Sequence, residues 1–306
     1  MKILLIAPRG FCAGVNMAIE ALERAVALFG TPLYTFHEIV HNRHVVEDFR
    51  NKGVRFVDHI DEVPPGGRLM YSAHGVSPAV RAQAAERNLQ VIDATCPLVR
   101  KVHHEAVRFA REGYTIILVG HRGHDEVVGV MGEAPEQMML VETVDDVDRL
   151  EVPDPKKVAY LTQTTLSVDE TRAIILRLRE RFPSCVGAAK EDICYATQNR
   201  QEALRAMLPQ ANVVLVVGSQ NSSNSNRLAE VARQQGTQAY LIDSSQEIDP
   251  AWFSGTETVL ITAGASAPEN IVVDCVDFLR RTFDAKVLEH SVREEHVEFA
   301  LPLEVR

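Results

Sequence analysis

The spacing of three of the five cysteines does not fit most of the roles that cysteines take in pairs. Cys12, Cys96 and Cys194 each follow an apolar, strand-like run and lie in a polar, turn-rich motif, about one in each third of the chain. No two of them form a local CxxC pair, from which structural zinc sites and dithiol redox motifs are normally built. If the three thiols converge in the fold, they form a three-thiolate site with one coordination position left open.

Zinc and an iron–sulfur cluster both suit three thiolate ligands. The segment His124–Asp125–Glu126 matches the first half of the signature of zinc-dependent nucleobase deaminases, but no second cysteine follows Cys96 to complete it. A cubane iron–sulfur cluster accepts well-separated cysteines, and with three of them one iron lacks a protein ligand and can act as a Lewis acid toward a substrate oxygen. A zinc hydrolase and a non-catalytic iron–sulfur sensor that binds a phosphorylated ligand stay open as alternatives.

The other two cysteines, Cys185 and Cys275, have no flanking ligand motif. Cys185 lies at the end of one predicted helix, and Cys275 lies inside another. A buried cysteine in such a context behaves as a small hydrophobic residue, so we expect both to be structural.

A strand–loop–helix rhythm must position the three thiols. Apolar, β-branched runs alternate with segments of helical period, which indicates an α/β fold with parallel sheets covered on both faces. The predicted strands are 2–7, 33–36, 68–73, 91–94, 115–119, 139–141, 158–162, 213–217, 239–242 and 258–262. The predicted helices are 16–29, 99–112, 168–182, 198–207, 227–235 and 270–283.

Polar motifs rich in Cys, His, Ser, Thr and Asn follow most of these strands. Ligands bind at the carboxyl ends of strands in open parallel sheets, so the motifs predict one shared site. Ser222, Ser223 and Asn224 also begin a predicted helix, where free N–H groups and the helix dipole favour a phosphate.

Bulk properties exclude some classes of function. The chain has 306 residues and a formal net charge of −10, which argues against a general nucleic-acid binder. No apolar run reaches the ~18 residues of a membrane span, and a strand begins directly after the first residue, so we expect a cytoplasmic protein without a signal peptide. A local positive patch is still expected beside two of the cysteine motifs, from Arg9, Arg100, Lys101, His103 and His104.

Strings along almost the whole chain resemble the 4-hydroxy-3-methylbut-2-enyl diphosphate reductase family, which catalyses the last step of the methylerythritol phosphate route to isoprenoids. They are APRGFCAGV, HEIVHN, SAHGVS, DATCPLV, GHRGHDE, QTTLSV, DICYATQNRQ, GSQNSSNSNRL and TAGASAPE. The resemblance implies three pseudo-symmetric α/β lobes with mostly parallel sheets, arranged as a trefoil around a central iron–sulfur cluster. We expect the first lobe at 1–96 with the first two cluster cysteines. The second is expected at 97–193 with the His124, Glu126 and Thr164 loops, the third at 194–285 with the Ser/Asn diphosphate loop, and a tail at 286–306.

The family's functional positions carry over to matching motifs. One [4Fe–4S] cluster per chain is implied, with Cys12, Cys96 and Cys194 as its three ligands. The implied diphosphate contacts are His41, His74, Ser222, Asn224 and Ser266, with Ser223 lining the pocket. His124, Glu126 and Thr164 are implied to face the allylic alcohol: Glu126 as the proton source, Thr164 as a relay and His124 as an orienting group.

The implied reaction is reductive dehydroxylation of (E)-4-hydroxy-3-methylbut-2-enyl diphosphate to isopentenyl and dimethylallyl diphosphate, with the substrate hydroxyl bound to the unique iron. Flavodoxin or ferredoxin is expected as electron donor, docking near the positive patch. We expect no nucleic-acid or membrane partner, and a monomer or weak dimer. The tail at 292–306 alternates charged and apolar residues and is expected to lie along the body as a strand.

Overall fold

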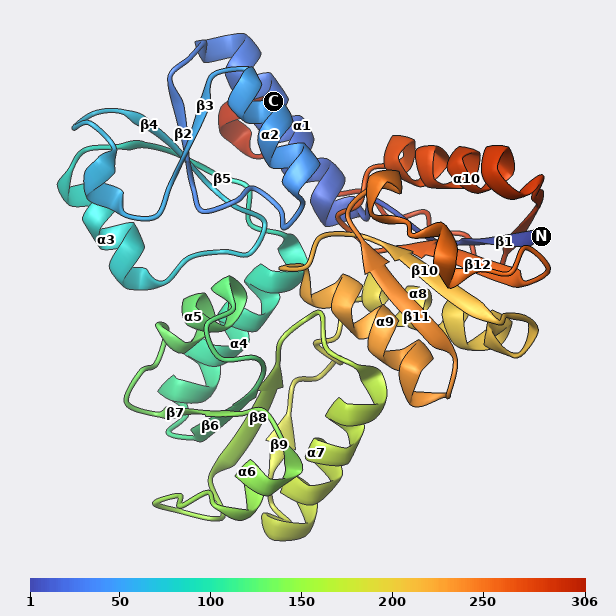
Figure 1. Ribbon diagram of the computed structural model, residues 1–306. Helices are drawn as coiled ribbons and strands as arrows, with labels where there is room; N and C mark the ends of the chain where they lie inside the picture. The colour runs from blue at the N-terminus through green and yellow to red at the C-terminus, as the bar shows by residue number, and fades with distance from the viewer. The chain divides into compact units, whose positions relative to one another are not determined.

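A computed structural model describes residues 1–306 and contains three separate β-sheets, in which all paired strands run parallel (Figure 1). Parallel strands cannot be joined by tight turns and need crossover connections, which the intervening helices provide. The predicted α/β class with three parallel-sheet lobes is therefore confirmed.

The largest sheet has five strands and combines both ends of the chain. Its strands in spatial order are β11 (Gln238–Ile242), β10 (Val213–Val217), β12 (Thr258–Ala263), β1 (Lys2–Ala7) and β13 (Lys286–Ser291). The helices that accompany it are α8 (Tyr195–Met207), α9 (Ser223–Gln234) and α10 (Glu269–Phe283), with short 3₁₀ turns η2 (Leu208–Gln210), η3 (Ser245–Glu247) and η4 (Pro250–Trp252).

Both faces of this sheet are apolar because helices cover both. On one face Leu215 packs in a cluster with Val272 and Leu279 of α10, and on the other Val214 packs in a cluster with Leu228 of α9. Burying each such side chain contributes on the order of 1.5–3 kcal/mol relative to leaving it in water. All five residues of β10 are buried, which is why its run of valines and leucine was recognisable as a strand.

Two strands of this sheet differ from the sequence-based expectation. The expected first lobe, 1–96, includes β1, whereas the hydrogen-bonded neighbours of β1 are β12 and β13, so the blue strand in Figure 1 lies beside orange and red ones. The expected strand at 292–306 is wrong: the terminal strand is β13, and 292–306 contains only the turn η5 (Leu303–Val305). β13 forms because the edge of β1 is open for pairing, and its own side chains are mostly exposed.

The other two sheets have four strands each. The first has the order β3 (Val54–Val57), β2 (Leu33–Phe36), β4 (Arg68–Tyr71), β5 (Gln90–Asp93), and the second β7 (Met138–Val141), β6 (Thr115–Val119), β8 (Val158–Thr162), β9 (Val186–Gly187). The remaining helices are α1 (Ala13–Phe29), α2 (Arg43–Asn51), α3 (Pro78–Glu86), α4 (Pro97–Arg111), α5 (Asp125–Met131), α6 (Val144–Asp148) and α7 (Val168–Arg181), with η1 (Ile60–Glu62).

The chain divides into two compact units. The first unit comprises Met1–Val15, His41–Asp48 and Tyr195–Glu298 and contains the five-stranded sheet. The second unit comprises Asn16–Val40, Phe49–Cys194 and Phe299–Arg306 and contains both four-stranded sheets. None of the helices combines the length and the apolar character that crossing a lipid bilayer requires.

Candidate functional site

The three widely spaced cysteines occupy equivalent local positions. Each stands directly before a helix: α1, α4 or α8. Each backbone N–H donates to the carbonyl oxygen of a residue just beyond the end of a parallel strand. The pairs are Cys12 to Ala265 at 3.1 Å, Cys96 to Ala73 at 3.0 Å and Cys194 to Thr164 at 3.0 Å. All three are partly buried and free of disulfides, so the fold presents each thiol at a helix start in the same way.

This donor set fits an iron–sulfur cluster. The N-terminal ends of helices favour thiolates, and thiolates are the ligands of such clusters. Tyr195, which follows Cys194, accepts a hydrogen bond at 3.1 Å from the backbone N–H of Ala13, which follows Cys12. The starts of α1 and α8 are therefore joined at the residues next to two of the thiols.

The other two cysteines are in different surroundings. Cys275 lies on α10 and packs in the core cluster that this helix forms with the five-stranded sheet. Burial raises the pKa of its thiol to about 12. Burial likewise raises the pKa of Cys185 to about 11. Both therefore stay protonated near neutral pH, which supports a structural role.

Glu126, in the first turn of α5, is a buried carboxyl with two partners from one residue. The Thr164 backbone N–H donates to Oε1 at 2.7 Å, and the Thr164 hydroxyl donates to Oε2 at 2.8 Å. Burial raises the pKa of Glu126 to about 7, against the two bonds from Thr164, and the negative charge of Asp192 raises it further. A carboxyl with a pKa near 7 can both hold and release a proton at neutral pH.

His124 caps the N-terminus of α5. Its Nδ1 accepts a hydrogen bond from the Glu126 backbone N–H at 3.2 Å, so the neutral ring carries its proton on Nε2. The His124 ring meets that of His74 edge-on, with centroids 5.8 Å apart. The structure thus brings three predicted residues, His74, His124 and Glu126, into one neighbourhood of the second unit.

Asp125 and His37 belong to the same neighbourhood, and the sequence reasoning assigned neither a role. Asp125 Oδ1 lies 2.7 Å from His37 Nδ1, and its Oδ2 lies 3.9 Å from His74 Nδ1. The hydrogen bond and the charge of Asp125 raise the pKa of His37 above its usual value, although burial opposes this. The sequence could have pointed to His37, because it directly follows a strand, as the predicted site residues do.

The start of α9 in the first unit holds an amide without partners. Ser222 caps the helix and accepts from the Ser225 backbone N–H at 3.4 Å. Asn224 is only 4% exposed, yet neither its Oδ1 nor its Nδ2 has a hydrogen-bond partner. Leaving such groups unpaired costs about 1–3 kcal/mol, so the Asn224 amide is suited to a polar ligand at the helix N-terminus.

The backbone approaches this helix start closely. A Cβ on Gly218 would lie 2.2 Å from Ser225 Oγ, and one on Gly264 would lie 2.0 Å from it. Only glycine fits at either place, so the loops after β10 and β12 pack directly on the first turn of α9.

His41 and Ser266 lie on the first unit as well. The Ser266 hydroxyl donates to the His41 carbonyl oxygen at 2.9 Å, and the Arg43 backbone N–H donates to Ser219 Oγ at 3.0 Å. These bonds hold the segment that carries His41 to the loops after β12 and β10. The predicted diphosphate residues His41, Ser222, Ser223, Asn224 and Ser266 are therefore all in the first unit, and His74 is in the second. That all of them contact one ligand stays a prediction.

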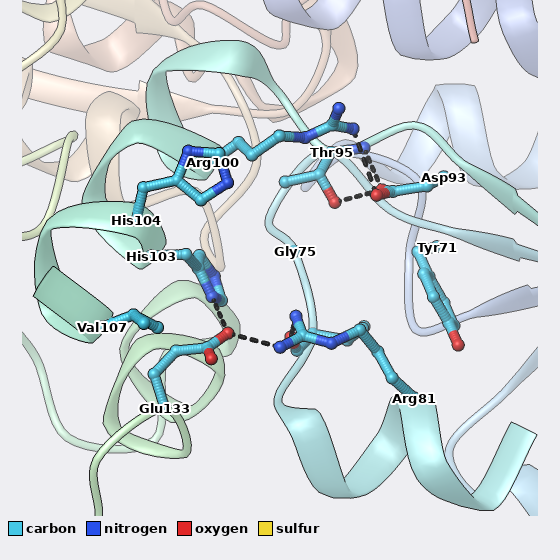
Figure 2. Close-up of a pocket in the computed structure, with 11 residues that line it drawn as sticks. Tyr71, Gly75, Arg81, Asp93, Thr95, Arg100, His103, His104, Val107 and Glu133 are labelled. Atoms are coloured by element: carbon cyan, nitrogen blue, oxygen red, sulfur yellow. Dashed lines mark hydrogen bonds and ion pairs between the residues drawn. The ribbon is translucent and has the colours of Figure 1, made fainter. Parts of the chain in front are cut away.

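The expected positive patch is largely neutralised by acidic partners. The ion pairs are Arg9 with Glu269, Arg100 with Asp93, Lys101 with Asp192 and His103 with Glu133. Figure 2 shows Asp93 and Glu133 holding three basic side chains around a pocket of about 290 Å³ in the second unit. The pattern of basic residues was visible in the sequence, but three of the four partners lie 30 or more residues away, and only Asp93 is near its partner Arg100 in the chain.

Comparisons with known proteins point in one direction. The family model described as LytB protein matches residues 3–280. A 4-hydroxy-3-methylbut-2-enyl diphosphate reductase of Rhodopirellula baltica is 59% identical over 100% of this chain and 96% of its own length, and one of an Azoarcus species is 54% identical, covering 100% and 98%. The solved structure of the E-1-hydroxy-2-methyl-but-2-enyl-4-diphosphate reductase from Plasmodium falciparum is similar with a TM-score of 0.97 at 38% identity, covering 99% of this chain and 96% of that one.

Proposed function

The chain belongs to the LytB protein family, and we propose that it reduces (E)-4-hydroxy-3-methylbut-2-enyl diphosphate to isopentenyl and dimethylallyl diphosphate. In this reaction the allylic C–O bond breaks and the oxygen leaves as water after taking up a proton. Two electrons and a second proton go to the allyl fragment. The observation that carries the proposal is the buried Glu126–Thr164 pair, whose carboxyl has a pKa of about 7.

The protein is an iron–sulfur enzyme, and we assign Cys12, Cys96 and Cys194 as the three ligands of one [4Fe–4S] cluster. Their equivalent positions before helices support this assignment. A bound cluster would pass on the two electrons one at a time and would offer a Lewis-acidic iron to the substrate hydroxyl. The electrons come from an external one-electron carrier of the flavodoxin or ferredoxin class. The pairing of the basic residues near the cysteines removes the charge argument for a docking site there.

Glu126 is the proton donor to the departing hydroxyl. Loss of hydroxide needs acid assistance, and a carboxyl whose pKa matches the working pH is best suited to give it. The Thr164 hydroxyl holds Glu126 Oε2 and is placed to pass on its proton. His124, with its proton on Nε2, serves as a hydrogen-bond donor that orients the alcohol.

The diphosphate binds at the start of α9. Free N–H groups and the helix dipole favour an anion there, and the unpartnered Asn224 amide supplies an additional donor. We assign His41, His74, Ser222, Ser223 and Ser266 as further contacts. A buried carboxyl with a raised pKa favours this enzyme over a non-catalytic sensor, and the relatives do not favour a zinc hydrolase.

Anaerobic purification followed by metal analysis and turnover tests the proposal. We expect a brown protein that contains iron and acid-labile sulfide and consumes the allylic diphosphate with a reduced dye. Cys194→Ser should lose iron and sulfide, whereas Cys185→Ser should keep both and serves as the matched control. A colourless zinc protein would contradict the proposal, and a brown protein without turnover would favour the sensor.

A further inference from the structure

One lysine joins the segment before Cys194 to the helix that starts after Cys96. Lys101 lies on α4, and its ammonium group donates to the Lys190 carbonyl at 2.7 Å, the Glu191 carbonyl at 3.1 Å and Asp192 Oδ1 at 2.9 Å. An ammonium group has three protons, so all of its donors go to one three-residue segment. That segment ends two residues before Cys194.

Hydrogen bonds also join this segment to the loop that contacts Glu126. Asp192 Oδ2 accepts from the Thr162 backbone N–H at 3.1 Å, and the Cys194 N–H donates to the Thr164 carbonyl at 3.0 Å. Thr164 in turn donates twice to Glu126. A continuous set of bonds therefore runs from Lys101 through Asp192 and Cys194 to the proton donor.

Packing gives this segment little support on its other side. Residues 188–193 border a cavity of about 360 Å³ whose opposite wall is formed by α7, including Thr171 and Ile175. Because interiors hold side chains in place by close packing, a segment that lines a cavity depends on its polar bonds. Asp192 is 7% exposed, and a buried carboxylate is costly without a cationic partner, which Lys101 provides.

We propose that Lys101 is a positioning residue for the iron–sulfur cluster, because it holds the Cys194-bearing segment against the helix that follows Cys96. The inference rests on the assignment of both cysteines as cluster ligands. Lys101 itself touches no reacting atom. It acts through Asp192 on the position of the Cys194 thiol and through Thr164 on Glu126.

The test compares Lys101→Met with a matched lysine in the same unit. Lys157 also donates to a backbone carbonyl, that of Glu112 at 3.0 Å, but it lies far along the chain from both cysteines. We expect Lys101→Met to release iron to a chelator roughly 10- to 100-fold faster than wild type, as is usual when groups that orient metal ligands are lost. Lys157→Met should release iron at the wild-type rate.

Hydrogen exchange gives a readout that does not depend on turnover. In Lys101→Met the backbone amides of Thr162 and Cys194 should exchange faster than in wild type, because the bonds that protect them lose their anchor. Lys101→Arg should lie between the two, since a planar fork cannot direct its donors as a compact ammonium does. Unchanged iron release and unchanged exchange in Lys101→Met would overturn the proposal.

The Cys194→Ser variant separates this proposal from the assignment of the ligands. If Cys194→Ser loses iron while Lys101→Met retains it, only the positioning role fails. If Cys194→Ser keeps a full cluster, the ligand assignment itself fails. Should Lys101→Met not fold, Asp192→Asn and Lys101→Arg decide, and wild-type iron retention in both would count against the role.

Discussion

Glu126 and Asn224 are almost equally hidden from solvent, but their polar atoms are in opposite situations. Glu126 is 2% exposed, and both carboxylate oxygens accept hydrogen bonds from Thr164. Asn224 is 4% exposed, and neither amide atom has a partner. The difference teaches that the polar atoms of Glu126 are satisfied within the protein, whereas those of Asn224 await a partner, which in the proposed function is the diphosphate.

The two arrangements serve different purposes. The bonds from Thr164 keep the pKa of Glu126 near 7, whereas burial alone would raise it further. Asn224 instead keeps its hydrogen-bonding capacity for an anion, and the protein is less stable for it. Substitutions at these two places should therefore change different measured quantities.

Glu126→Gln should have the largest effect, because it removes the proton donor and keeps the size of the side chain. We expect turnover to fall by roughly 10²- to 10⁴-fold, the usual contribution of a general acid. Iron content and substrate affinity should stay close to wild type, as measured by metal analysis and by titration with the substrate. Near-normal turnover would remove Glu126 from this role.

Asn224→Ala should chiefly weaken binding. Losing hydrogen bonds to a charged diphosphate raises the Michaelis constant by roughly 10- to 100-fold, with a smaller change in turnover. Without substrate, the free energy of unfolding should stay equal or rise by about 1 kcal/mol, since an unpaired buried amide is removed.

Asn226 on the same helix is the matched control for this variant. Its Nδ2 donates to the Gln220 and Ser222 carbonyls at 2.7 and 2.9 Å. Asn226→Ala should therefore lower the free energy of unfolding by about 1 kcal/mol. If Asn224→Ala destabilises the protein as Asn226→Ala does and leaves the Michaelis constant unchanged, the contrast between the two sites is wrong.

Thr164→Val should have the most specific effect, on the pH dependence of turnover, together with a fall in turnover that is smaller than that of Glu126→Gln because only the relay hydroxyl is lost. The hydrogen bond from the Thr164 hydroxyl to Glu126 Oε2 lowers the pKa of that carboxyl. Removing the hydroxyl should therefore raise the pKa of Glu126 above about 7. Because the protonated carboxyl is the active form, the fall of turnover at high pH should shift to higher pH. Thr164→Ser should keep the wild-type profile, and an unshifted limb in Thr164→Val would show that the hydroxyl does not tune Glu126.

The sequence predicted some strands well and others not at all, for physical reasons. Strand β10 is a run of valines and leucine that is apolar on both faces, so the sequence predicted a buried strand there. The runs at Val54–Val57 and Lys286–Ser291 were missed, because each includes exposed or charged positions. An edge strand takes its stability from pairing with a neighbour, and its own side chains show little of it.

The types of the site residues were determined by the sequence alone. Lone cysteines before helices, the capped start of α9 and the histidines at strand ends are local features, since caps and strand ends depend on a few neighbouring residues. Tertiary structure alone decided what these residues contact. It paired Glu126 with Thr164, left the Asn224 amide without a partner, and joined Lys101 to the segment before Cys194. Those contacts join residues far apart in the chain, so burial, pKa and hydrogen-bond satisfaction exist only once the fold has brought them together.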